Sequence, residues 1–149
     1  MAVLYLDTSA LVRRYDSTEP AAAQVRAACV PARGNDLLIC ELTSVEVAAA
    51  LSMKRRTGQV PAARVARLWR RFRTHRARQY QTIGLTLAQV GRAEELTFQV
   101  PVKALYALHI AAALAASSAS PTTPLTFWTA DRQQAHAART AGLDVYLVG

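Results

Sequence analysis

Short apolar runs alternate with longer amphipathic or Ala-rich stretches along the chain. The apolar runs predict strands at residues 2–6, 36–40, 80–84, 125–129 and 145–148. The stretches between them predict a helical turn at 9–15 and helices at 20–30, 44–56, 61–78, 86–97, 102–116 and 131–141, three of them opening at Pro20, Pro61 and Pro101. Parallel strands need crossover connections, which are normally helices. The pattern therefore predicts an α/β fold: a three-layer α/β/α domain with a mainly parallel central sheet of about five strands.

Length and composition favour one globular domain spanning residues 1–149. The chain has 149 residues, of which 52% are hydrophobic and 19% charged, as in ordinary folded proteins. No apolar run approaches the roughly 20 residues that span a bilayer, and the first residues lack a signal-peptide pattern. We therefore expect a cytoplasmic protein with no membrane partner, in which Cys29 and Cys40 are reduced and structural.

Positive charge is concentrated in one predicted helix. The net charge is +8, and ten of the 18 Lys and Arg residues lie between Lys54 and Arg78. Val65, Leu68, Trp69 and Phe72 recur at helical spacing through this stretch, which predicts an apolar inner face and an arginine-rich outer face. That face suits a polyanion such as RNA, and the candidate contacts are Arg64, Arg67 and Arg71. A merely solvated helix face explains the pattern about as well.

Three acidic residues follow predicted strands or open predicted helices. Asp7 follows the first strand, Glu46 lies near the start of the helix after the second, and Asp131 follows the fourth. The carboxyl ends of parallel strands share one edge of a sheet, so these acids are expected to converge there. Each acid also has a structural interpretation. Asp7 and Asp131 can cap helices, and Thr43 with Glu46 matches a capping box.

Four sequence blocks together resemble the PIN-domain family, and within it the VapC toxins of bacterial toxin–antitoxin pairs. The blocks are LDTSAL at 6–11, TSVEV at 43–47, LYALHIA at 105–111 and TADR at 129–132. Their order and spacing span essentially the whole chain. The resemblance implies a metal-dependent endoribonuclease that cleaves RNA phosphodiester bonds, forms a homodimer and is neutralised by a cognate antitoxin.

The chemistry of phosphodiester cleavage agrees with this resemblance. A hard cation such as Mg²⁺ or Mn²⁺ neutralises charge on the phosphate and activates water, and it prefers oxygen ligands. Asp7 and Asp131 are candidate catalytic metal ligands. Glu46 is expected to bind a second ion or orient the water. Thr8 and Thr129 are expected to hold the carboxylates or contact phosphate.

Tyr106 departs from the family pattern, which has an aspartate at this position. A neutral phenol is a poor ligand for a hard cation, so a second ion and full activity become doubtful. Tyr106 is interpreted as a natural degeneration, an introduced inactivating change or a platform for base stacking. The alternative function is a catalytically degenerate module that binds RNA or antitoxin. His109, one helical turn later, is expected to be a packed residue rather than a catalytic base.

Overall fold

The computed structural model describes residues 2–149. Within these residues the chain forms one five-stranded sheet in which every strand pairing is parallel, in the order β3-β2-β1-β4-β5. The strands are β1 (Val3–Leu6), β2 (Asp36–Cys40), β3 (Tyr80–Ile83), β4 (Leu125–Thr129) and β5 (Asp144–Leu147). The predicted fold class is confirmed, and the sheet is wholly rather than mainly parallel.

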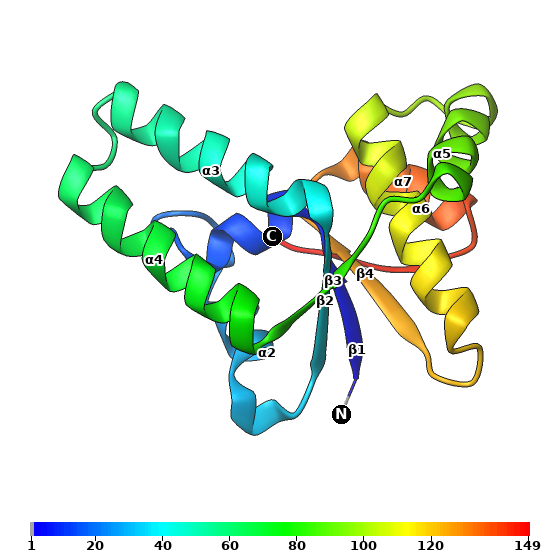
Figure 1. The fold of residues 1–149 in the computed structure, drawn as a ribbon, viewed down its shortest axis with the longest axis horizontal. Coiled ribbons are helices and arrows are strands. Elements are labelled where there is room, and N and C mark those ends of the chain that lie inside the picture. The colour runs from blue at the N-terminus through cyan, green and yellow to red at the C-terminus, as the bar shows by residue number, and fades with distance from the viewer. Residues whose placement is uncertain (1) are drawn as a thin grey trace.

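Helices cover both faces of this sheet (Figure 1). One side carries α2 (Ala22–Cys29), α3 (Glu41–Arg56) and α4 (Ala62–Arg78), and the other carries α5 (Leu87–Gln99), α6 (Ala104–Ala119) and α7 (Arg132–Thr140). The shorter pieces are α1 (Thr8–Leu11) and the 3₁₀ turns η1 (Val12–Arg14) and η2 (Pro31–Arg33). In the part of the chain that is described, no helix is both long and apolar enough to cross a membrane.

Alternation along the strands divides the interior into two cores. Leu4 and Leu6 of β1 pack with the apolar faces of α3 and α4, whereas Tyr5 between them packs with α5 and α6. This is the period-2 pattern of a sheet that is buried on both faces. In α4, Val65 and Phe72 face the first core as predicted, which leaves the arginines on the outer side.

Three predicted helix starts are wrong by two or more residues, including that of α6, which begins at Ala104 rather than residue 102. The second helix begins at Ala22 rather than Pro20, because Ala21 adopts a left-handed conformation with φ of 59° and turns the chain first. Helix α3 begins at Glu41 rather than residue 44. Its capping box pairs Cys40 with Thr43, so the predicted box between Thr43 and Glu46 does not form. Glu46 therefore lies in the second turn of α3, and its carboxylate is not used as a helix cap.

Candidate active site at the carboxyl edge of the sheet

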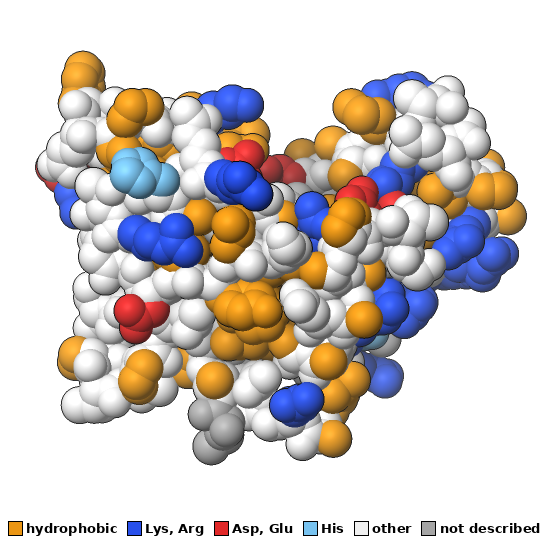
Figure 2. Space-filling view, turned by 180° about the vertical axis from the view of Figure 1, so that it is seen from behind, with side chains coloured by type: hydrophobic (Ala, Val, Ile, Leu, Met, Phe, Trp, Pro, Cys, Tyr) orange, Lys and Arg blue, Asp and Glu red, His pale blue; other side chains and the backbone are white. Residues whose placement is uncertain are grey.

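The three predicted acids sit on elements that meet at the carboxyl edge of the sheet. Asp7 directly follows β1, which lies between β2 and β4, and Asp131 lies two residues beyond β4. Glu46 is on α3, the helix that begins where β2 ends. In an open parallel sheet, the point where the connections diverge to the two sides is the usual place for a ligand. Figure 2 shows the surface hollowed at this edge between the two groups of helices, with acidic side chains in the hollow.

Asp7 is a buried carboxylate surrounded by neutral hydrogen-bond donors. It is 1% exposed, and Oδ1 accepts from the Ala10 backbone N–H at 2.9 Å, so the residue does cap α1. Ser9 Oγ donates at 2.8 Å to Oδ1, and Thr129 Oγ1 donates at 2.8 Å to Oδ2. Burial raises the pKa of Asp7, although nearby His109 and these hydrogen bonds oppose the increase. The negative charge is therefore held in place but left without a direct cationic partner.

Thr129 joins the first acid to the third. The same oxygen that donates to Asp7 accepts the Asp131 backbone N–H at 3.1 Å. Ser9 reinforces the link, because its Oγ accepts the Ala130 backbone N–H at 2.9 Å. Asp131 in turn caps α7, with Oδ1 accepting the Gln134 backbone N–H at 2.8 Å. Asp7 and Asp131 thus both cap helices, as their structural interpretation predicted. The cap made by Asp131 uses only Oδ1.

Glu46 is oriented by two side chains that contact the same oxygen. Thr8 Oγ1 donates to Oε1 at 2.9 Å, and His109 Nε2 lies 2.6 Å from Oε1. The glutamate side chain is 21% exposed, whereas the histidine side chain is 2% exposed. Thr8, predicted to hold a carboxylate or contact phosphate, is therefore placed against the second acid, while Thr129 is placed against the first.

His109 is a packed residue, as expected, but it also connects the site to a buried polar cluster. Its Nδ1 lies 2.9 Å from Tyr5 Oη and 3.6 Å from Cys40 Sγ. Burial lowers the pKa of His109, but hydrogen bonds with Cys40 and Glu46 outweigh this and raise it to about 10. For Cys40 the directions are opposite. Burial raises the pKa of its thiol, but the contacts with His109 outweigh this and lower the pKa to about 7. A protonated imidazole can thus donate to Glu46 from behind.

Tyr106 lies among the three acids. Its hydroxyl donates to Asp131 Oδ2 at 3.3 Å. Burial is the largest cause that raises the pKa of the phenol, and the charges of Asp131, Asp7 and Glu46 raise it further. The phenol is therefore neutral at pH 7, where it acts as a hydrogen-bond donor to a carboxylate.

The donor set fits a hard divalent cation in its chemistry. Asp7, Asp131 and Glu46 offer carboxylate oxygens, and the charge of the buried Asp7 has no ion pair to compensate it. Within residues 2–149, no three His, Cys, Asp or Glu side chains are already close enough together to enclose an ion. Mg²⁺ uses one or two carboxylates and keeps several waters, so this open arrangement suits it better than a closed protein cage.

The predicted RNA contacts lie on the outer face of α4 but not in one place. Arg67 and Arg71 line a shallow hollow together with Arg70 and His75. Arg64 lies apart from them, next to a small cleft near Asp16 and Lys54. The three arginines stand at positions i, i+3 and i+7 of α4 and so share one face of it, although they line two different hollows.

Sequence reasoning missed Ser9 and underestimated His109. Ser9 contacts both oxygens of Asp7 and the chain after β4, and its only sequence signal is its position two residues beyond a strand-ending acid. His109 contacts Glu46 across 63 positions of sequence. Its spacing of three residues from Tyr106 on one helix was a usable signal, since such residues share a face.

Comparison with solved structures identifies proteins of the same fold. No family model matches the chain, and no curated protein matches it by sequence. VapBC2 from Rickettsia felis, solved bound to a DNA fragment from its promoter, aligns with a TM-score of 0.66 and 13% identity over 99% of both chains. FitAcB from Neisseria gonorrhoeae aligns with a TM-score of 0.68 and 14% identity over 96% of both chains. VapC20 from Mycobacterium tuberculosis, a toxin that cleaves the sarcin–ricin loop, aligns with a TM-score of 0.61 and 11% identity over 94% of this chain and 95% of that one. The chain therefore shares the overall fold of these toxin and toxin–antitoxin proteins.

Proposed function

We propose that this protein is a metal-dependent endoribonuclease of the toxin–antitoxin type. The observation that carries the proposal is the buried Asp7 carboxylate, which forms no ion pair within residues 2–149 and lies at the edge of the sheet where Glu46 and Asp131 also sit. The fold supports it, because one protein of similar structure is a toxin that cleaves an RNA loop. Mg²⁺ or Mn²⁺ is the proposed cofactor, since carboxylate oxygens are the ligands these ions prefer.

Asp7 and Asp131 are the proposed ligands, kept in a fixed relation by the hydroxyl of Thr129. The bound ion would supply positive charge to the phosphate and acidity to water. Glu46 is oriented through Oε1 by Thr8 and His109, which leaves Oε2 to accept a proton from the attacking water. This division of work uses each acid once and requires no fourth carboxylate.

Cleavage of a labelled structured RNA with and without Mn²⁺ tests the proposal. We expect cleavage that depends on Mn²⁺ and falls at least a hundredfold in Asp7→Asn, because removing a ligand charge weakens an oxygen-ligated site. Asp144→Asn is the matched control, because Asp144 is an exposed acid at the opposite end of the sheet, on the first residue of β5. Metal-dependent cleavage that survives unchanged in Asp7→Asn contradicts the proposal.

Tyr106 favours a second candidate function, a module that binds RNA or antitoxin without cutting. Its hydroxyl occupies one oxygen of Asp131 as a hydrogen-bond donor, which reduces the capacity of that carboxylate to hold an ion. We therefore propose that the nuclease activity of this chain is lower than it would be with an aspartate at position 106. A strictly binding role predicts that RNA affinity is retained in Mn²⁺ while cleavage is absent.

Tyr106→Asp separates the two candidates. If the site is an impaired nuclease, the added carboxylate should strengthen Mn²⁺ binding in calorimetry by at least tenfold and increase the cleavage rate. Tyr106→Phe serves as a control, because it removes the hydrogen bond to Asp131 without adding an acid. Equal metal affinity and no cleavage in all three proteins would favour the binding module.

Two proposed protein partners follow the likeness to toxin–antitoxin complexes. A cognate antitoxin is expected to suppress activity, and adding it to the cleavage assay tests this. A homodimer is favoured by Leu87 and Phe98, which are 90% and 92% exposed. They lie eleven residues apart on α5, about three helical turns, and so share one face. Light scattering on Phe98→Glu should show a smaller particle than the unaltered protein if this face joins two copies.

A further inference from the structure

Helix α4 carries positive charge that no neighbouring carboxylate balances. It contains seven arginines and no acidic residue, and the sequence has no Asp or Glu between Glu46 and Glu94. The ion pairs found in residues 2–149 involve Arg13, Lys54, Arg92 and His109, so none includes an arginine of α4. Like charges this close repel one another, and a polyanion relieves that repulsion.

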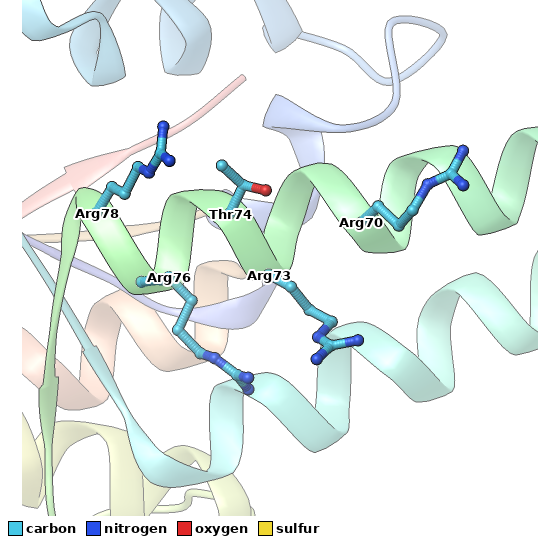
Figure 3. Close-up of a pocket in the computed structure, with 6 residues that line it drawn as sticks. Arg70, Arg73, Thr74, Arg76 and Arg78 are labelled. Atoms are coloured by element: carbon cyan, nitrogen blue, oxygen red, sulfur yellow. The ribbon is translucent and has the colours of Figure 1, made fainter.

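Part of this charge surrounds a surface hollow of about 500 Å³. The hollow is lined by Arg70, Arg73, Thr74, Arg76, Ala77 and Arg78, all between the middle and the end of α4. Figure 3 shows Arg73 and Arg76 extending from the helix toward α3, whereas Arg70 and Arg78 extend from its opposite side. These are different residues from Arg64, Arg67 and Arg71, which the sequence pattern suggested.

One of these arginines connects the hollow to the acidic site. Arg76 Nη1 donates to Ser44 Oγ at 2.9 Å. Ser44 lies in the first turn of α3, two residues before Glu46. The guanidinium is also steadied by the Phe72 ring, whose centroid is 5.9 Å from its central carbon. The hollow therefore reaches the first turn of α3, the helix that also carries Glu46, although Ser44 and Glu46 project from different sides of that helix.

The chemistry of the lining favours phosphates over bases or apolar side chains. Guanidinium groups bind phosphate oxygens through paired hydrogen bonds, and a threonine hydroxyl adds another donor. The described lining contains no aromatic side chain on which an unpaired base could stack. It likewise offers no deep apolar pocket of the kind that anchors a protein segment. A nucleic acid bound here would be recognised through its phosphate groups, independently of its base sequence.

We propose that the hollow on α4 holds the RNA phosphate backbone on one side of the bond to be cut. This inference rests on the proposed function, because it places the same polymer in both sites. Arg73 and Arg76 hold the phosphates on the side of α4 that faces α3, and Arg70 and Arg78 hold phosphates on the opposite side of the helix. The consequence is that substrate affinity depends on α4 while the choice of cleavage position does not.

Binding of a hairpin RNA to the Asp7→Asn protein tests the inference without cleavage. The test variant also carries Arg73→Gln and Arg76→Gln, since glutamine keeps much of the side-chain length and a donor for Ser44. The matched control instead carries Arg26→Gln and Arg33→Gln, which remove the same charge from exposed arginines on α2 and η2. Circular dichroism melting of both variants verifies that they fold.

We expect the test variant to bind at least tenfold more weakly at about 50 mM salt and the control to change less than twofold. The slope of log affinity against log salt should also fall by about two for the test variant, one for each lost phosphate contact. Equal losses in the two variants would overturn the inference, because they would indicate diffuse attraction. Displacement of the RNA by poly-glutamate at the same molar charge would also overturn it in favour of an acidic protein segment.

Failure of the proposed function is seen separately. Mn²⁺-dependent cleavage by the protein with Asp7 intact reports on the acidic site alone. A protein that does not cut but loses RNA affinity in the test variant supports the hollow and contradicts the nuclease. The opposite result is Mn²⁺-dependent cleavage by the protein with Asp7 intact, together with unchanged RNA affinity in the test variant. It supports the nuclease and contradicts the role of the hollow.

Discussion

Two buried charges in this molecule are satisfied in opposite ways. Asp7, at the carboxyl edge, accepts hydrogen bonds from neutral donors and makes no direct ion pair within residues 2–149, although His109 is nearby. Arg14, on the other side of the sheet, donates to Tyr80 Oη at 2.6 Å and to Gln79 Oε1 at 2.7 Å and has no carboxylate beside it. Both side chains are at most 9% exposed.

The difference lies in where each network ends. From Arg14, hydrogen bonds pass through the hydroxyls of Tyr80 and Tyr15 to His75 Nδ1, a neutral acceptor. The path runs from a charged donor to a final acceptor, and it joins η1, β3 and α4. Around Asp7 all the hydrogen bonds point toward the charge and come from neutral donors, so within residues 2–149 no direct ion pair neutralises it. We interpret the closed network around Arg14 as structural and the open network around Asp7 as part of a binding site.

The largest expected effect comes from breaking the closed network. Arg14→Met should lower the free energy of unfolding by about 3 kcal/mol, because one buried and one partly buried acceptor lose their donor and the replacement supplies none. Urea denaturation measures the change, with Arg26→Met as a matched exposed control. If both variants unfold at the same urea concentration, the network around Arg14 contributes nothing to stability.

A smaller effect of opposite sign is expected at the open network. In metal-free buffer, Asp7→Asn should raise the free energy of unfolding by about 1 kcal/mol, since the amide still caps α1 and no charge is buried. Mn²⁺ should reverse the order, because a ligand that binds the folded protein at about 100 times its Kd adds about 2.7 kcal/mol. Equal stabilisation of both proteins by Mn²⁺ would show that Asp7 is not a ligand.

The smallest effect concerns the neutral end of the closed network. Burial, with the nearby charges of Arg14 and Arg71, lowers the pKa of His75 to about 4 from the ordinary 6.5. Between these values the unfolded chain binds more protons than the folded one, so stability should increase as the pH is raised from 4 to 6.5. Thermal melts of His75→Gln should show a flatter profile in this window. His136→Gln, at an exposed position, should leave the profile unchanged.

Much of the fold could be predicted because burial leaves a local pattern. Runs such as Leu37-Leu38-Ile39 can only be accommodated in a strand covered on both sides, and the strands were predicted to within one residue at each end. Helix starts were less predictable. Ala21 carries no signal for its left-handed turn, and Thr43 matched a capping pattern with Glu46 although Cys40 is its actual partner.

The site was predictable only as far as each acid follows a strand or begins a helix. The parallel order brings Asp7 and Asp131 together from opposite ends of the chain, which the sheet rule anticipates. Contacts such as His109 with Glu46 depend on how α6 and α3 pack over the sheet, and nothing in the local sequence specifies that packing. Buried Arg14 was also missed, because arginine is normally an exposed residue and the local sequence does not indicate its burial.

The place of β1 in the sheet has a consequence for synthesis of the protein. Among residues 2–149 it is the first strand to be made, yet it pairs along its whole length with β4, more than 120 residues later. Such distant pairings form late in folding. A nascent chain therefore carries Asp7 for most of its translation without Thr129 or Asp131, and the acidic site assembles only when nearly the whole domain has left the ribosome.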